Sequence, residues 1–92
     1  MDENRYVEVA KHAIGLGYRK PYTRHGQRWY RPYRNYFSTS IGSLDYDLWD
    51  TMESAGYANS RRTEDRAMFW LTRSGLDWLG EKLGMHIYDE ED

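Results

Sequence analysis

The second half of the chain carries helix and strand signals in an order that few small folds can accommodate. The patterns predict a helix, two strands and a final helix, over residues 44–55, 57–62, 67–71 and 72–83. Ser43 and Thr72 are of the residue types that cap helix N-termini, and Gly56 and Gly84 can take the left-handed conformation that ends a helix. The polar segment 63–66 between the strands has the length of a hairpin loop. These residues therefore predict a β-hairpin between two helices.

Apolar spacing predicts which side of each of these helices is buried. The last helix presents Leu76, Leu79 and Leu83 on one side. On the helix over 44–55, the apolar stripe consists of Leu44, Leu48, Met52 and Ala55. A charge in the middle of this stripe, as in Leu48→Asp, is expected to unfold the domain.

The first half of the chain is less regular. A helix is predicted near the N-terminus, closed by Gly15 and Gly17. Residues 18–27 have no apolar periodicity and contain Pro21 and Gly26, so they are predicted to form a loop. The apolar stripe of the predicted N-terminal helix consists of Tyr6, Val9, Ala10, Ala13 and Ile14.

Two further segments have weaker strand patterns. Residues 28–38 alternate loosely, which predicts a strand interrupted at Pro32 with Trp29, Tyr33 and Phe37 on its inward side. Residues 85–88 either add a strand or pack as a tail.

The size and composition of the chain limit its class. A chain of 92 residues fits one domain, spanning 1–92. It has no cysteine, which excludes disulfides and thiolate metal sites and suits a reducing cytoplasm. No apolar run approaches the roughly 18 residues of a membrane span, and the start of the chain is acidic, unlike a signal peptide. We therefore expect a cytoplasmic protein with no membrane partner.

Basic and aromatic residues gather in one segment, residues 18–36, which we call the basic aromatic segment. It contains six of the fifteen aromatic residues and none of the fifteen carboxylates, although the net charge of the chain is −2. Residues 88–92 end the chain as an acidic tail. Arginines between flat rings suit phosphate contacts with base stacking or an acidic protein partner. Alternatively, these charges are solvated or paired with the chain's own acids. The basic residues are Arg19, Lys20, Arg24, Arg28, Arg31 and Arg34.

The hairpin and the following helix resemble a known family. The pair Asp65-Arg66 followed by Leu71-Thr72-Arg73-Ser74-Gly75 is similar to the wing and next helix of MarR-type winged-helix regulators. The resemblance implies an α+β fold: a small winged-helix-like domain with three helices and a short antiparallel sheet or β-hairpin wing. It also implies that Arg66 is a wing-tip contact, that Arg61 and Arg62 are basic positions beside it, and that Leu71, Thr72 and Gly75 are structural.

A second resemblance covers most of the chain. The segments His12–Gly17, Tyr33–Phe37, Ala55–Ala58 and Leu71-Thr72, with Gly42-Ser43 and Asp45-Tyr46, are similar to those of small bacteriophage and prophage proteins. This resemblance implies a phage accessory protein that works inside a bacterial host. Small phage proteins of this size include inhibitors of host defence such as anti-CRISPR proteins.

The chain departs from a DNA-reading winged helix in one respect. That family has two helices between its first strand and its wing, and this chain offers one, over residues 44–55. This helix carries four carboxylates and no Lys or Arg, so it would repel phosphate. Sequence-specific reading of the major groove is therefore not expected. The carboxylates belong to Asp45, Asp47, Asp50 and Glu53.

Catalysis is not indicated by any motif. His12, His25 and His86 are far apart in the sequence, and none belongs to a pair with metal-ligand spacing. There is no glycine-rich phosphate loop and no nucleophile elbow. We therefore expect a non-enzymatic protein that needs no cofactor.

Two functional hypotheses follow. In the first, the protein binds a host protein or nucleoprotein complex, with its aromatic residues as anchors and its acidic helix and tail against a basic surface. In the second, it is a regulator that binds DNA or RNA through the basic aromatic segment and the wing. Either is compatible with a monomer or a homodimer. Both use the same candidate residues: Arg24, Arg28, Trp29, Tyr30, Arg31, Tyr33, Arg34, Arg61, Arg62 and Arg66.

Overall fold

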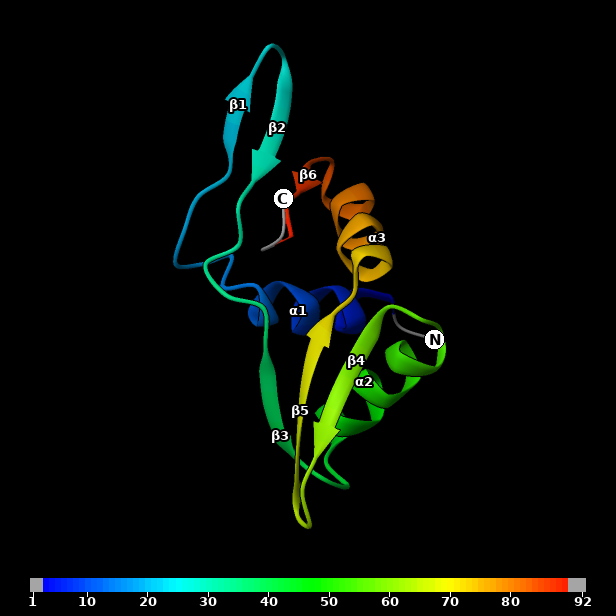
Figure 1. The fold of residues 1–92 in the computed structure, drawn as a ribbon. Coiled ribbons are helices and arrows are strands. Elements are labelled where there is room, and N and C mark those ends of the chain that lie inside the picture. Colours follow the sequence, from blue (N-terminus) through cyan, green and yellow to red (C-terminus); the bar gives the residue numbers. More distant parts are fainter. Residues whose placement is uncertain (1–2, 90–92) are drawn as a thin grey trace.

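A computed structural model describes residues 3–89 as three helices and six strands, arranged in two small sheets (Figure 1). The helix, strand, strand, helix order of the second half is confirmed, and so are the α+β class and the three helices. In chain order the elements are α1 (Glu3–Ala13), β1 (Tyr22–Arg24), β2 (Gln27–Tyr30), β3 (Phe37–Ser40), α2 (Leu44–Ser54), β4 (Ala58–Arg62), β5 (Arg66–Leu71), α3 (Arg73–Leu83) and β6 (His86–Ile87).

The larger sheet is antiparallel, with the strand order β3-β5-β4. The central strand β5 alternates between buried and more exposed side chains, because one face of the sheet packs on α2 and the core. Ala67, Phe69 and Leu71 point to the buried face. Within residues 3–89, α2 is the one helix between β3 and β4, so the companion helix of a DNA-reading winged helix is absent.

The smaller sheet has the order β1-β2-β6, and it corrects the prediction that residues 18–27 form only a loop. β1 and β2 are antiparallel, and β6 pairs with β2 in parallel. A two-residue turn joins β1 to β2, with positive φ angles of 55° at His25 and 76° at Gly26. Every residue of β1 is exposed, so this strand shows no burial periodicity that its sequence could reveal.

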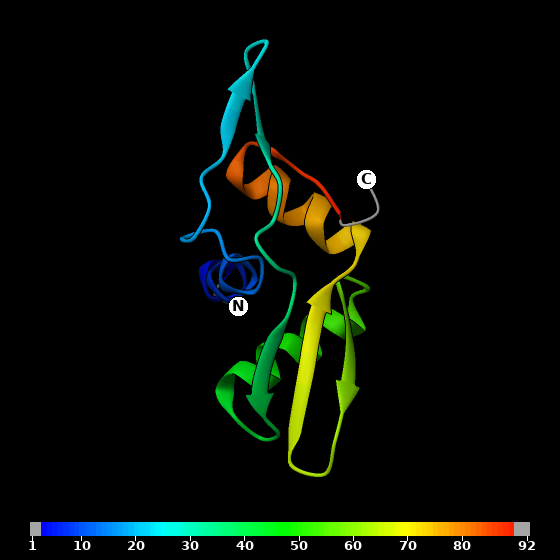
Figure 2. The same ribbon diagram turned by 60° about the vertical axis from the view of Figure 1, so that its left-hand side comes forward.

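The β1–β2 hairpin, which we call the arm, extends away from the three helices. Figures 1 and 2 show the arm and the loop of the β4–β5 hairpin at opposite ends of the molecule. The body between them contains α1, which contacts α2, α3 and β5. The molecule is correspondingly long, with extents of 46 × 27 × 21 Å.

The core contradicts the predicted stripe of the helix over 44–55. Leu44 is 72% exposed and Ala55 is also exposed, whereas Trp49 is completely buried beside the buried Met52. The Trp49 indole stacks on Phe69 of β5, with ring centroids 5.6 Å apart. The sheet thus packs on a different side of the helix from the predicted one. This side carries Trp49, the largest apolar side chain of α2, whose burial contributes most to stability.

The strand predicted over 28–38 is two strands in two different sheets. β2 ends at Tyr30, and β3 begins at Phe37. Tyr30 is completely buried, whereas Tyr33, predicted to point inward, is 56% exposed. The Tyr30 hydroxyl donates to the carbonyls of Ile14 and Gly15 at 3.3 and 3.0 Å. Its burial raises the pKa of Tyr30.

Helix boundaries agree with the predicted caps. The hydroxyls of Ser43 and Thr72 accept from the backbone N–H groups of Tyr46 and Gly75. Gly84 ends α3 with a left-handed φ of 70°. The predicted stripes of α1 and α3 supply buried core residues: Ala10, Ala13, Ile14, Leu76 and Leu79.

Candidate binding surface on the arm

Aromatic and basic side chains meet on one face of the β1-β2-β6 sheet. The register pairs Tyr22 with Trp29, and Trp29 with His86, so these three side chains form a row across the strands. Alternation along the chain adds Arg24 after Tyr22 and Tyr88 after His86 to the same side. We call this set the arm face: Tyr22, Arg24, Trp29, Arg31, His86 and Tyr88.

The rings of the arm face pack on one another. Trp29 and Tyr88 stack with centroids 5.7 Å apart and planes at 18°, and His86 meets both rings edge-on. The Trp29 indole N–H also donates to the Arg24 carbonyl at 3.4 Å. These contacts fix the aromatic side chains in one arrangement before any partner binds, which lowers the entropy cost of binding.

Two arginines give the arm face its positive charge. The Arg31 guanidinium lies over the Tyr88 ring, 4.4 Å from its centroid. Arg24 is exposed near the tip of the arm. A side-chain hydrogen bond with Tyr22 raises the pKa of Tyr88, and the charges of Arg31 and Arg24 oppose this shift. The Tyr88 hydroxyl therefore stays protonated at neutral pH.

The opposite face of the same sheet anchors the arm to the body. Tyr30 and Ile87 are completely or almost completely buried there, while Arg28 is exposed farther along the arm. Tyr30, one of the candidate binding residues, is therefore not available to a partner, because its ring lies in the core and its hydroxyl donates to backbone carbonyls. Trp29 keeps a half-exposed ring.

The rest of the basic aromatic segment forms a second cluster at the base of the arm. The Arg34 guanidinium lies 5.4 Å from the ring centroids of both Tyr18 and Tyr36, and it donates to the His12 carbonyl at 3.0 Å. The exposed Tyr33 ring packs on Tyr18 at 5.5 Å. The Arg34 side chain therefore binds the C-terminal end of α1 and is only partly available to a partner.

The acidic end of the chain reaches this second cluster. A hollow of about 190 Å³ is lined by Arg19, Arg31, Pro32, Arg34 and Asp89. Asp89 thus lies beside three arginines, and its charge offsets part of theirs. The other acids of the predicted tail, Glu90 to Asp92, lie outside the described residues.

The arginines of the β4–β5 hairpin do not join the arm face. Arg62 binds the body: it donates to the Tyr46 hydroxyl at 3.1 Å and pairs with Asp50 and Glu53 at 3.0 and 2.9 Å. The hydrogen bonds to Tyr46 and Glu53 raise the pKa of Arg62. The single charge of Arg62 thereby offsets part of the charge of two of the four carboxylates of the acidic helix, so α2 is a weaker acidic surface than the sequence predicts.

The other two arginines of this hairpin lie on the outward side of the larger sheet. Arg66 donates to the hydroxyls of Ser40 and Ser38 at 3.4 and 3.3 Å. Arg61 is exposed, and it lines a hollow of about 570 Å³ with Met68 and Trp70. Arg66 begins β5 directly after the loop of the hairpin, and its carbonyl accepts from the Thr63 N–H at 2.8 Å, so it lies at this tip; its role as a wing-tip contact stays a prediction.

Sequence reasoning missed three residues of the arm face: Tyr22, His86 and Tyr88. Tyr22 was assigned to a loop, and the other two lie more than fifty residues from Trp29 in the chain. The alternation of buried Met85 and Ile87 with His86 and Tyr88 was the available signal, because it suits a half-buried strand.

Between residues 3 and 89, no group of three His, Asp or Glu side chains is placed to hold a metal ion. No helix of that region has both the length and the apolar character needed to cross a membrane. Comparison with known proteins adds no assignment, since no family model, no curated protein and no solved structure matches this chain.

Proposed function

We propose that the protein is a non-enzymatic binding protein that docks on a partner protein through its arm face. The observation that supports this proposal is the preformed row of Tyr22, Trp29 and His86, with Tyr88 stacked on Trp29. Trp, Tyr and Arg are the residues that most often dominate the energy of protein interfaces. A rigid cluster of them on one face of the projecting hairpin, where it meets β6, can pack against a partner surface.

The charge of the arm specifies the kind of partner. Arg24, Arg28 and Arg31 are exposed, and residues 18–36 contain no carboxylate. An acidic patch on the partner would therefore complement the arm and speed association. The earlier idea that α2 meets a basic surface loses support, because Arg62 already pairs with Asp50 and Glu53.

The resemblance to small phage proteins suggests where such a partner occurs. Under this proposal the protein acts in a bacterial host as a phage accessory protein, and the partner belongs to a host defence or nucleic-acid-handling complex. Blocking such a complex by occupation needs no catalytic group and no cofactor.

Site-specific photo-crosslinking tests the proposal. A photoreactive amino acid replaces Gln27 at the tip of the arm, and a control protein carries it at Glu64 in the β4–β5 loop at the other end. In nuclease-treated bacterial lysate, position 27 is expected to crosslink one protein that position 64 does not. Excess wild type should suppress this product, and excess Arg24→Glu/Arg31→Glu protein, which is changed on the arm face, should not. Products from position 64 alone would refute the proposal.

Single-stranded nucleic acid is the second candidate ligand. It is favoured by the exposed guanidiniums of Arg24 and Arg28, which the strand alternation places on opposite faces of the arm beside the half-exposed Trp29. The test is fluorescence anisotropy with an oligonucleotide longer than the roughly 4–16 nucleotides that such sites cover. Affinity should fall steeply between about 50 and 200 mM salt. Absence of binding at micromolar protein would exclude this candidate.

A further inference from the structure

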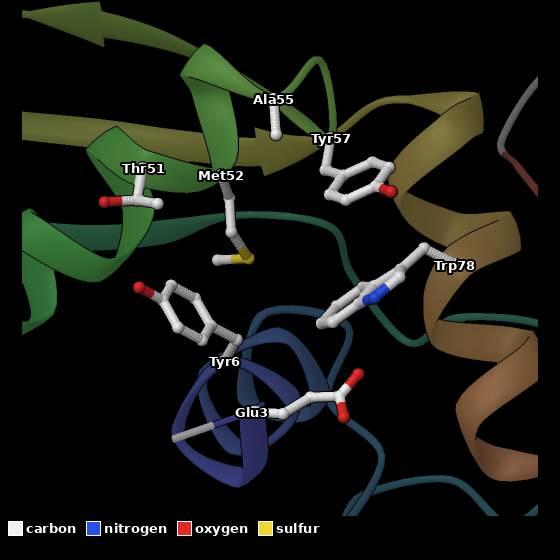
Figure 3. A pocket seen from close by; sticks show the side chains of 7 residues that line it. All are labelled: Glu3, Tyr6, Thr51, Met52, Ala55, Tyr57 and Trp78. Carbon is white, nitrogen blue, oxygen red and sulfur yellow. The ribbon is translucent and has the colours of Figure 1, made fainter. Parts of the chain in front are cut away.

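A cavity of about 390 Å³ opens where the three helices meet, away from the arm. Its volume lies in the range of roughly 300–1,000 Å³ that is usual for small-ligand sites. Figure 3 shows the side chains that surround it, with Glu3 and Tyr6 from α1, Met52 from α2 and Trp78 from α3. Tyr57, between α2 and β4, completes the aromatic lining.

Aromatic rings form two sides of this cavity. Tyr57 and Trp78 stack with centroids 5.5 Å apart and planes at 16°, so they act as one wall. Tyr6 lies across the open space from Trp78, and the thioether of Met52 points between them (Figure 3). A group seated there would face the π-electrons of several rings and a polarizable sulfur.

A carboxylate lies at the edge of this aromatic space. Glu3 lines the cavity, and its Oε1 pairs with the Lys82 ammonium at 2.6 Å. This hydrogen bond raises the pKa of Lys82. Glu3 therefore already holds one ammonium group at the edge of the cavity, and Lys82 itself does not line the cavity.

We propose that the cavity binds a trimethylammonium group. Such a group carries a positive charge that aromatic faces and a carboxylate attract, which a neutral apolar ligand lacks. It also has no N–H donor, so its burial against rings leaves no hydrogen bond unmade. A primary ammonium seated among the rings would lose hydrogen bonds to water, because Glu3, the carboxylate at the edge, already pairs with Lys82. This site is independent of the arm and of the partner proposed for it.

The charge requirement can be tested without any variant. The wild-type protein is titrated with choline and with 3,3-dimethyl-1-butanol (dimethylbutanol below). This alcohol is the neutral isostere of choline, with carbon in place of the quaternary nitrogen. NMR signals of the Trp78 indole and the Met52 methyl group report occupation of the cavity. Choline is expected to bind at least about tenfold more tightly, as a desolvated cation–π contact implies. Equal affinities, or shifts confined to other residues, would overturn the proposal.

Two substitutions test the site itself. Glu3→Gln is expected to weaken choline binding several-fold while leaving dimethylbutanol unaffected, and the matched control Glu81→Gln, on the exposed side of α3, should change neither. Trp78→Leu should abolish the preference for choline. Because Trp78 is half-buried, the melting temperature of the Trp78→Leu variant is measured first. If this variant does not fold, the comparison of choline with dimethylbutanol on the wild type decides whether the cavity prefers a cation.

The source of the group is resolved by two further probes. Trimethyllysine amide represents a modified protein side chain, and phosphatidylcholine vesicles represent a lipid headgroup. Tighter binding of either one supports the proposal and identifies the carrier. Failure of choline and of both probes to bind would exclude the site.

Discussion

Gly75 in the first turn of α3 lies directly against the backbone carbonyl of Tyr57. A Cβ atom at position 75 would stand 2.0 Å from the Tyr57 oxygen and 3.1 Å from a methyl group of Leu71. The same Tyr57 carbonyl accepts from the Thr72 N–H at 3.1 Å. The Leu-Thr-x-x-Gly sequence therefore couples the start of α3 to the residue that precedes β4.

Gly75→Ala is expected to destabilise the protein by about 1–3 kcal/mol or more, because the carbonyl can move only with the backbone of β4. Gly17→Ala is the matched control, since a Cβ at position 17 would meet nothing within 4 Å. The free energy of unfolding in urea measures both. Equal stability of the two variants would contradict the close approach at Gly75.

Trp49→Ala is expected to cost about 3–5 kcal/mol, the usual range for deleting a buried aromatic side chain. Leu48→Ala should cost clearly less, because Leu48 is only half-buried. For the same reason Leu48→Asp should leave the domain folded, contrary to the expectation from the sequence. Thermal melting of the three variants tests this ranking, and a fully unfolded Leu48→Asp protein would restore the original stripe.

Tyr30→Phe is expected to cost about 1 kcal/mol, the net value of a typical hydrogen bond. The cost stays low because the carbonyls of Ile14 and Gly15 also accept from the N–H groups of Tyr33 and Tyr18. Urea unfolding at neutral pH measures it. A loss several times larger would mean that these carbonyls depend on the Tyr30 hydroxyl.

The stability of the wild type should also depend on alkaline pH. Burial raises the pKa of Tyr30 above its ordinary value of 10.0, so the folded state holds this proton more tightly than the unfolded chain. The resulting stability is fully present below pH 10.0 and is lost as the pH rises through the folded-state pKa. Tyr30→Phe should show a smaller alkaline decline, although Tyr88, whose pKa is also raised, still contributes. Identical declines would exclude Tyr30 as a source.

Arg62→Ala is expected to lower stability by about 1 kcal/mol or less, since exposed ion pairs are screened by solvent. The Arg62 side chain is 34% exposed, and it bridges β4 to Asp50 and Glu53 of α2. Arg61→Ala, the neighbouring change on the outward face, should be nearly neutral. Unfolding at low and at high salt separates the two, and an equal or larger loss in Arg61→Ala would contradict the role given to Arg62.

Local features of the fold were predictable because their causes are local. Ser43, Thr72 and Gly84 cap or end helices through residues no more than a turn away. The buried side of α2 was not predictable in this way, because the sheet that covers Trp49 is formed by strands before and after the helix. β6 likewise depends on a parallel pairing with β2 across more than fifty residues.

The candidate site was predicted in composition but not in arrangement. The basic aromatic segment supplies Arg24, Trp29 and Arg31 to the arm face, as its charge pattern suggested. The sequence could not distinguish these from Tyr30, whose burial depends on the position of Ile14 and Gly15. Nor could it reveal that Arg62 is held by Asp50 and Glu53, since a charge pattern does not specify which pairs form.

The shallow attachment of the arm has a consequence for how its specificity can change. Among the residues of β1, β2 and β6, only Tyr30 and Ile87 are buried. Substitutions at the remaining positions alter the exposed surface of the arm with little effect on the folding of the body. The chemistry of this surface can therefore change while the scaffold is retained, with Tyr30 and Ile87 as the positions in these strands that resist replacement.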